Sequence, residues 1–494
     1  MSKYEVFFNK IAENLDLTET EFNTIRDSYN ALGRYLTSSE VLANFEADVF
    51  PQGSVRLGTV IKPLKRDDYD IDLVCKFTKN DQNLLPKQVK HLVGTSLKNS
   101  NYSYRLDEEH GRCWTLNFYS NPPYHIDILP GVSIDYSERV KATIKDDNGK
   151  YDWLYTNPKG FAKWFQSVAN KRFTLDESRK VEPVKKYSDK SPLQRAIQLV
   201  KRHRDVYYSE NPDDGPASVI ITALMGLSYN GEGTIEEILR KNPITWASHI
   251  KLINGKYSIK IPTLPDDDYA DKWNGEDPDA AKRFFEWHAR LLLDLDTLFA
   301  QIKIEGFLAC ASRMFHQSSV DKIKTNSALV VDSLTESFKK QTQLPVRLED
   351  AHPLFEHAKS ISSFGHCYLP RGNNKISISC KAYKSVDDRE KDINSLYHFN
   401  SSSPLLEKGV SLRFTASIVN APKSYYLLWQ ITNTGYEASD CLRGKFEKSD
   451  FYRTKLETTS YSGTHFVQAF LIDSYSTNCV AKSNIITINI GATK

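Results

Sequence analysis

The chain has 494 residues, of which 40% are hydrophobic and 26% are charged, and its formal net charge at pH 7 is +3. This composition is that of a folded globular protein with about two or three domains. The small net charge excludes a polycation built for bulk nucleic-acid binding, so nucleic-acid binding is not indicated. The seven cysteines form no CxxC pair, and the sequence predicts neither a stable zinc site nor a disulfide framework.

The polar N-terminus has no signal-peptide core, and no segment reaches the ~18 apolar residues of a membrane span. We therefore expect a cytoplasmic protein with reduced thiols and no membrane contact.

Apolar spacing predicts helices over about the first 45 residues, where Thr18 and Glu21 form a capping-box pattern. Residues 50–130 then change to strand patterns, with a helix around residues 87–97 between them. This mixture predicts an α/β sheet with helices on one face. Helical spacing resumes over residues 158–170, and the basic stretch 172–190 is typical of an exposed connection. We assign residues 1–190 to a first lobe, built on the sheet and including the N-terminal helices.

Strong helical patterns follow in SPLQRAIQLVKRHRDVYY, ASVIITALMGLSY and AAKRFFEWHARLLLDLDTLFAQI, so residues 191–345 are predicted to form a helical second lobe. After a linker at residues 346–364, short β-rich runs are separated by Gly, Asn and Ser at sandwich-like intervals. Residues 365–494 are therefore predicted to be a β-sandwich. The expected fold class is α+β, with a mixed-sheet lobe, a helical lobe and a C-terminal all-β domain.

Three short motifs in the first lobe carry chemistry. Gly53-Ser54 offers backbone N–H groups and a hydroxyl to a phosphate. Asp70 and Asp72 alternate with apolar residues on one strand, so they share a face and can hold a hard divalent cation. Asp127, in HIDILPGV, alternates in the same way. A lone D-x-D is usually an ordinary strand edge, but the three motifs in this order predict a two-metal site for phosphoryl transfer.

Several basic residues are candidate phosphate contacts. Lys201 begins the KRHR run of a predicted helix and can face a triphosphate. For Arg202 and Arg204, an exposed basic helix face is an equally weighted alternative. Arg56 is a weaker candidate. We interpret His125 as a strand-edge histidine, because metal activation of a hydroxyl needs no histidine base.

In this order, the segments GSVRLGT, DYDIDLV and HIDILPGV resemble the polymerase-β nucleotidyltransferase superfamily, and most of all its bacterial cGAS/DncV-like branch, the CD-NTases. The resemblance covers about the first 330 residues. It implies two lobes with the active site in the cleft between them. The roles that it implies are phosphate contacts for Gly53 and Ser54, a triphosphate contact for Lys201, and two Mg²⁺ ions, or Mn²⁺, held by Asp70, Asp72 and Asp127.

The resemblance also implies a function. Members of this branch join nucleoside triphosphates without a template, usually into cyclic di- or trinucleotides that act as antiviral signals, which a separate effector protein detects. Synthesis of linear oligo(deoxy)nucleotides, a nucleotide-binding sensor without turnover, and transfer to tRNA or protein stay open as alternatives. The absence of a long basic stripe argues against tRNA.

About the last 130 residues resemble the AGS-C sensor domain, through the order W…NTG…LRG-x-F…G-x-H. Trp429, Arg443 and His465 could line a nucleotide pocket there. We favour a core position for Trp429. For Arg443 and His465, a structural role and a pocket role are equally weighted alternatives. Lys445 stands where this family often has an acidic residue, which puts inherited details of such a pocket in doubt.

Overall fold

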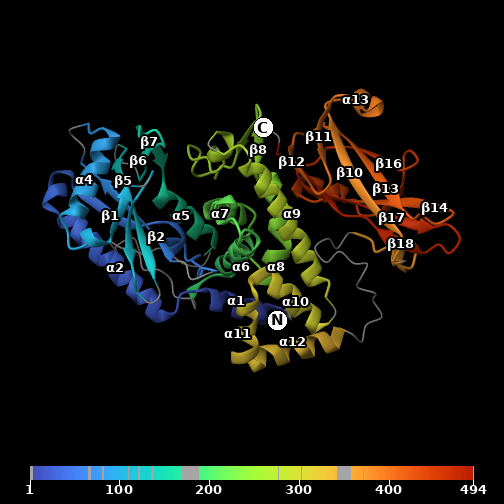
Figure 1. The fold of residues 1–494 in the computed structure, drawn as a ribbon, viewed down its shortest axis with the longest axis horizontal. Helices are drawn as coiled ribbons and strands as arrows, with labels where there is room; N and C mark the ends of the chain where they lie inside the picture. Colours follow the sequence, from blue (N-terminus) through green and yellow to red (C-terminus); the bar gives the residue numbers. More distant parts are fainter. Residues whose placement is uncertain are drawn as a thin grey trace.

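The structure is a computed structural model, which describes residues 4–64, 68–79, 83–109, 111–120, 123–134, 138–169, 189–275, 277–301, 303–341, 358–370 and 372–492. Nearly all of the expected basic connection at 172–190, and most of the expected linker at 346–364, lie outside these ranges. The described residues form a mixed-sheet lobe, a helical lobe and a β-sandwich (Figure 1). The predicted α+β class is confirmed.

The first lobe is built on a mixed sheet with the order β1-β2-β5-β4-β3, in which β6 pairs with β5 and β7. Strands β2 and β5 run parallel, and the other pairs are antiparallel. The strands are β1 (Ala47–Pro51), β2 (Tyr69–Phe77), β3 (Leu106–Glu109), β4 (Trp114–Phe118), β5 (Tyr124–Ser133), β6 (Val140–Lys145) and β7 (Tyr151–Thr156).

Two helices cover one face of this sheet, as predicted. They are α2 (Glu19–Ser38), which begins at the predicted Thr18 capping box, and α4 (Pro86–Lys98). Their apolar side chains share a core with the alternate residues Ile71 and Leu73 of β2. Because successive strand residues point to opposite faces, the intervening aspartates lie on the face that α2 and α4 leave uncovered.

The second lobe is helical, and α6 lies at its centre. Ser191 and Gln194 form a capping box at its start, and almost all of its residues from Leu193 to His203 are buried. The helices are α1 (Glu5–Leu15), α5 (Pro158–Ala169), α6 (Pro192–Tyr207), α7 (Ser218–Leu227), α8 (Ile235–Lys241), α9 (Ala280–Phe299), α10 (Ile304–Phe315), α11 (Gln317–Asn326) and α12 (Ala328–Gln341). A 3₁₀ helix, η5 (Pro243–His249), and a hairpin of β8 (Lys251–Ile253) and β9 (Lys256–Ser258) complete it.

Helices α1 and α5 pack in the helical lobe, although the sequence grouped both with the sheet. The apolar stripe of α1 meets an aromatic-rich surface, where Tyr4, just before the helix, stacks on Phe307 with ring centroids 4.9 Å apart. An amphipathic pattern indicates that a helix has a buried face but does not identify its partner, which is why the sequence misplaced α1. In the described chain no helix has the length and apolarity needed to cross a membrane.

The C-terminal domain is a sandwich of two sheets, with the orders β11-β10-β13-β16 and β12-β19-β17-β14-β15, and β18 pairs with β17. Trp429 is fully buried between the sheets, near Phe414. The strands are β10 (Lys375–Tyr383), β11 (Ser395–Phe399), β12 (Ser402–Leu406), β13 (Ser411–Val419), β14 (Tyr425–Thr432), β15 (Phe446–Lys448), β16 (Thr454–Thr458), β17 (Gly463–Asp473), β18 (Cys479–Lys482) and β19 (Ile486–Ile490); a short helix, α13 (Val386–Lys391), precedes β11.

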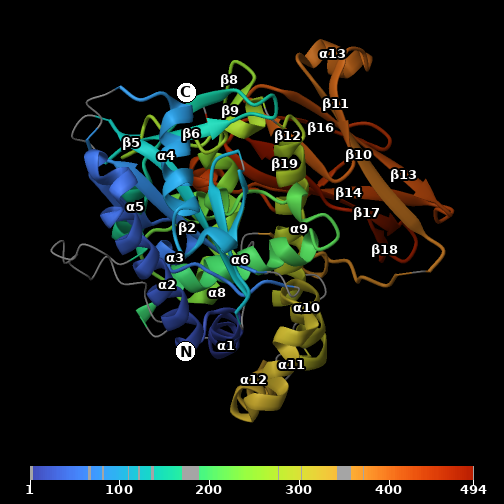
Figure 2. The same ribbon diagram turned by 60° about the vertical axis from the view of Figure 1, so that its left-hand side comes forward.

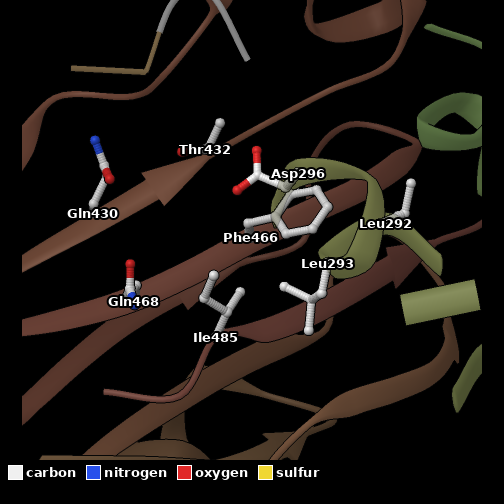
Figure 3. A pocket seen from close by; sticks show the side chains of 8 residues that line it. All are labelled: Leu292, Leu293, Asp296, Gln430, Thr432, Phe466, Gln468 and Ile485. Carbon is white, nitrogen blue, oxygen red and sulfur yellow. The ribbon is translucent and has the colours of Figure 1, made fainter. Parts of the chain in front are cut away.

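The sandwich shares a hydrophobic core with the helical lobe. Helix α9 runs along the boundary in both views (Figures 1 and 2). Phe466 of β17 belongs to the core cluster of the helical lobe and lies beside Leu293 and Asp296 of α9 (Figure 3). Thr434 Oγ1 also donates a hydrogen bond to the Ile244 carbonyl of η5, at 3.3 Å. The sandwich is therefore docked on the helical lobe.

We expect Phe466→Ala to lower the free energy of unfolding by about 3–5 kcal/mol, because it leaves a cavity between α9 and β17. Thermal and urea unfolding of the full chain measure this change. Phe451→Ala is the matched control, because Phe451 is 62% exposed, and we expect a change below about 0.5 kcal/mol. An equal change in the free energy of unfolding for the two variants would contradict the shared core.

Candidate active site

The pairing of β2 with β5 brings the acidic motifs together. The two strands are parallel and in a register that sets Asp70 opposite His125 and Asp72 opposite Asp127. Residues opposite each other on adjacent strands share a face, so all four side chains lie on the face opposite α2 and α4. The structure thus places the Asp127 strand directly beside the Asp70 strand, as the sequence predicts.

The side chains form a compact cluster of metal-ligand type. Asp70, His125 and Asp127 each offer one ligand atom, and these atoms lie within 4.8 Å of one another. Burial, and then the neighbouring Asp70 and Asp127, raise the pKa of Asp72 to about 8. Thr115 Oγ1, on β4, donates a hydrogen bond to Asp127 Oδ1 at 2.5 Å. Crowded carboxylates that repel one another fit a divalent cation, which offsets their charge.

Gly53 lies directly against this cluster. It begins the short helix α3 (Gly53–Leu57) with a φ of +62°, a conformation that favours glycine. A Cβ atom at this position would come within 1.9 Å of Asp72 Oδ2. The preceding Gln52 N–H donates to the Asp72 carbonyl at 2.9 Å. The absence of a side chain at Gly53 is therefore what lets the Gly53-Ser54 turn approach the carboxylates, and Ser54 lies next to it, half-buried.

Lys201 extends from α6 of the helical lobe to the first lobe. It is buried, and its Nζ donates to the Thr59 carbonyl at 3.1 Å and to Thr59 Oγ1 at 3.2 Å. Burial, followed by the charge of Arg204, lowers the pKa of Lys201 to about 7, and Asp72 is one of the charges that oppose this shift. The predicted cation therefore lies within electrostatic reach of the acidic cluster, at the junction of the two lobes.

One polar face of α6 holds the chain that follows α3. Gln194 donates to the Leu57 carbonyl and Gln198 to the Val60 carbonyl, each at 2.7 Å. Arg202 donates to the Lys62 carbonyl. Arg202 is only 3% exposed, so the alternative of an exposed basic face is wrong for this residue.

Two other predicted basic residues have local partners. Arg56 Nη1 donates to the Pro51 carbonyl at 3.3 Å, and its guanidinium lies over the Phe50 ring, 5.9 Å from the centroid. Arg204 bonds Asp205 and Ser218. A cleft of about 440 Å³ lies beside this end of α6, lined by Pro63, Leu64, Arg204, Asp205, Tyr208, Ser209, Pro212, Asp213, Gly215, Pro216 and Ala217.

The sequence interpretation missed His125, Thr115 and Thr59 as members of the site. For Thr115 and His125 a signal was present, because both lie at the same alternation as Asp127 on their strands. For Thr59 no local signal exists, since its role depends on the packing of α6 against a distant loop.

In the sandwich, the three residues that the sequence suggested as a nucleotide pocket do not all face one cavity. Trp429 is a core residue, and its Nε1 donates to Ser449 Oγ at 2.9 Å. Arg443 forms ion pairs with Glu447 and Glu457. Burial lowers the pKa of His465 to about 4, and Arg443 and His465 line a cavity of about 70 Å³. Two carboxylates thus engage the guanidinium that was considered for phosphate pairing.

Comparisons with known proteins agree with this geometry. Residues 1–169 match the Second Messenger Oligonucleotide or Dinucleotide Synthetase domain, and residues 356–491 match the Adenylyl/Guanylyl and SMODS C-terminal sensor domain. A c-di-GMP synthase of Roseivirga ehrenbergii is 32% identical over 287 residues, which are 56% of this chain and 75% of that protein. The cyclic dinucleotide synthase CdnG of Bradyrhizobium diazoefficiens is 24% identical over 293 residues, 53% of this chain and 68% of that protein.

The fold comparison adds the structure of the Bradyrhizobium diazoefficiens CD-NTase CdnG in complex with GTP. It has a TM-score of 0.52 and 18% identity, and it covers 66% of this chain and 99% of that one. The sheet, the cluster and the helical lobe together have a polymerase-β-type fold. The chain belongs to the CD-NTase family, with a C-terminal sensor-type domain.

We expect Gly53→Ala to lower kcat/KM for nucleotidyl transfer by about 100-fold, because the added Cβ displaces the Asp72 carboxylate. Steady-state transfer assays measure it. Gly33→Ala is the control: Gly33 lies in α2, and its added Cβ would meet the nearest atom, Val49 Cγ1, at 3.7 Å. Full activity of Gly53→Ala would show that the close approach of Gly53 to Asp72 is unimportant.

Proposed function

We propose that this protein joins two GTP molecules into a cyclic dinucleotide. The observation that carries the proposal is the cluster of Asp70, Asp72 and Asp127 on paired strands, facing the Gly53 turn. The names of the c-di-GMP synthase and of CdnG support the cyclic product, and the GTP complex of CdnG supports the guanine base. The two curated relatives span more than half of this chain.

The three aspartates are the proposed ligands of two Mg²⁺ or Mn²⁺ ions. Such ions lower the pKa of an attacking hydroxyl and offset the charge that develops at phosphorus. Such a cation would offset the burial and the neighbouring charges of Asp70 and Asp127 that together raise the pKa of Asp72. Thr115 fixes the direction of the Asp127 carboxylate.

The triphosphate is the proposed ligand of the turn and of α6. The backbone N–H groups at Gly53 and Ser54 and the Ser54 hydroxyl suit its terminal phosphates. Lys201 adds a positive charge from the opposite lobe. The 440 Å³ cleft beside Arg204 and Tyr208 has the size of a small-molecule site and suits the nucleoside.

We further propose that the product is a signal in antiphage defence that a separate effector protein detects. The support is the matched synthetase domain, whose description names second messengers. The C-terminal sensor-type domain, docked on the helical lobe, is placed to modulate the enzyme.

Incubation of the pure protein with Mg²⁺ and labelled ribo- and deoxynucleoside triphosphates tests the activity. We expect a phosphatase-resistant product from GTP, with the mass of a cyclic dinucleotide. Asp70→Asn and Asp127→Asn should each lower the rate at least about 1,000-fold, because each removes a charge from the cluster. A phosphatase-sensitive product would show linear synthesis, and binding of GTP without any product would show a sensor.

Lys201→Met tests the triphosphate contact. We expect kcat/KM for GTP to fall about 10- to 100-fold, because a charge-assisted phosphate bond is lost, together with a loss of stability from the missing bonds to Thr59. Gln198→Met is the matched control, because Gln198 binds the same loop from the same helix, and it should lower stability with a smaller effect on kcat/KM. If both variants change activity and melting in parallel, Lys201 only holds the loop.

A further inference from the structure

An imidazole stands inside the carboxylate cluster. His125 occupies the position on β5 opposite Asp70, and its Nε2 lies 3.5 Å from Asp70 Oδ1. Its ligand nitrogen belongs to the same group of atoms within 4.8 Å as the oxygens of Asp70 and Asp127. The side chain is 28% exposed, so the ring is accessible from the open face of the sheet.

The His125 Nε2 and Asp70 Oδ1 atoms lie 3.5 Å apart, at the long end of hydrogen-bond distances. Neighbouring ligands at about 2.1 Å from a six-coordinate ion lie about 3 Å apart, so a small closure of this pair would let both atoms bind one ion. The spacing therefore fits a shared cation as well as a direct bond between the two side chains, and the third ligand atom, on Asp127, is what points to the cation.

Nitrogen and oxygen ligands select different cations. Mg²⁺ prefers oxygen ligands and keeps its water, whereas imidazole favours transition metals, with affinity that increases from Mn²⁺ to Co²⁺. A site of two carboxylates and one imidazole therefore gains affinity for Mn²⁺ and Co²⁺ that a site of carboxylates alone does not have.

We propose that His125 is a direct ligand of one catalytic ion and that its nitrogen makes this site favour Mn²⁺ over Mg²⁺. The inference rests on the proposed function of the aspartate cluster as a metal site. The rival role is that of a positioning residue, which contacts Asp70 and leaves the ion to oxygen ligands.

Pulsed electron paramagnetic resonance of the full chain with Mn²⁺ alone separates these roles without any substitution. A coordinated imidazole gives a ¹⁴N coupling to Mn²⁺, which we expect in the wild-type protein. His125→Asn keeps an amide donor towards Asp70 but removes the ring nitrogen, so the coupling should disappear. Calorimetric titrations should show Mn²⁺ affinity falling about tenfold in this variant, and Mg²⁺ affinity changing less than about threefold.

Two further variants set the controls. His91→Ala removes an exposed histidine that lies near Glu109 and Tyr151 in the same lobe, and it should leave the coupling and both affinities unchanged. Asp127→Asn should weaken Mn²⁺ binding strongly. Mn²⁺ binding that depends on Asp127 but shows no ¹⁴N coupling overturns the role of His125 alone. Mn²⁺ binding that is absent, or equal in wild type and Asp127→Asn, overturns the metal site and with it the proposed function.

Discussion

Repulsion among the carboxylates on β2 and β5 is the constraint on which the rest of the structure depends. The register of two parallel strands holds Asp70, Asp72 and Asp127 together, and burial, followed by the charges of Asp70 and Asp127, raises the pKa of Asp72. A bound cation would offset this repulsion. Without a cation, the fold must be stable enough to hold the two strands together against it. The apolar side chains of the same two strands supply that stability, because they are buried under α2 and α4.

The second lobe contributes through one helix. Along α6, the residues Gln194, Gln198, Lys201 and Arg202 follow helical spacing and bind backbone oxygens of the chain between Leu57 and Lys62. This loop continues from the Gly53 turn, so α6 fixes the side of the site proposed for phosphate while β2 and β5 fix the side proposed for metal. Lys201 is the member of this row whose charge is proposed to exchange a backbone partner for a triphosphate.

The sandwich extends the same chain of contacts. Because strand residues alternate, β17 presents His465 to the interior cavity and Phe466 to α9. On the other side of α9, Trp287 Nε1 donates to His203 Nδ1 of α6, two residues from Lys201, at 3.1 Å. One sheet of the sensor-type domain thus contacts α9, which is itself bonded to α6 two residues from Lys201.

Local patterns predicted much of this molecule. Alternation in DYDIDLV and HIDILPGV predicted the faces of Asp70 and Asp127, and periodicity predicted α2, α4, α6 and α9. The missing parts are contacts between distant segments: α1 against α10, Gly53 against Asp72, and Lys201 against Thr59. His125 is the instructive case, because its alternation was visible but its position beside Asp70 was not. Whether a histidine is a strand-edge residue or a ligand depends on the residue opposite it, and that register exists only after β2 and β5 pair.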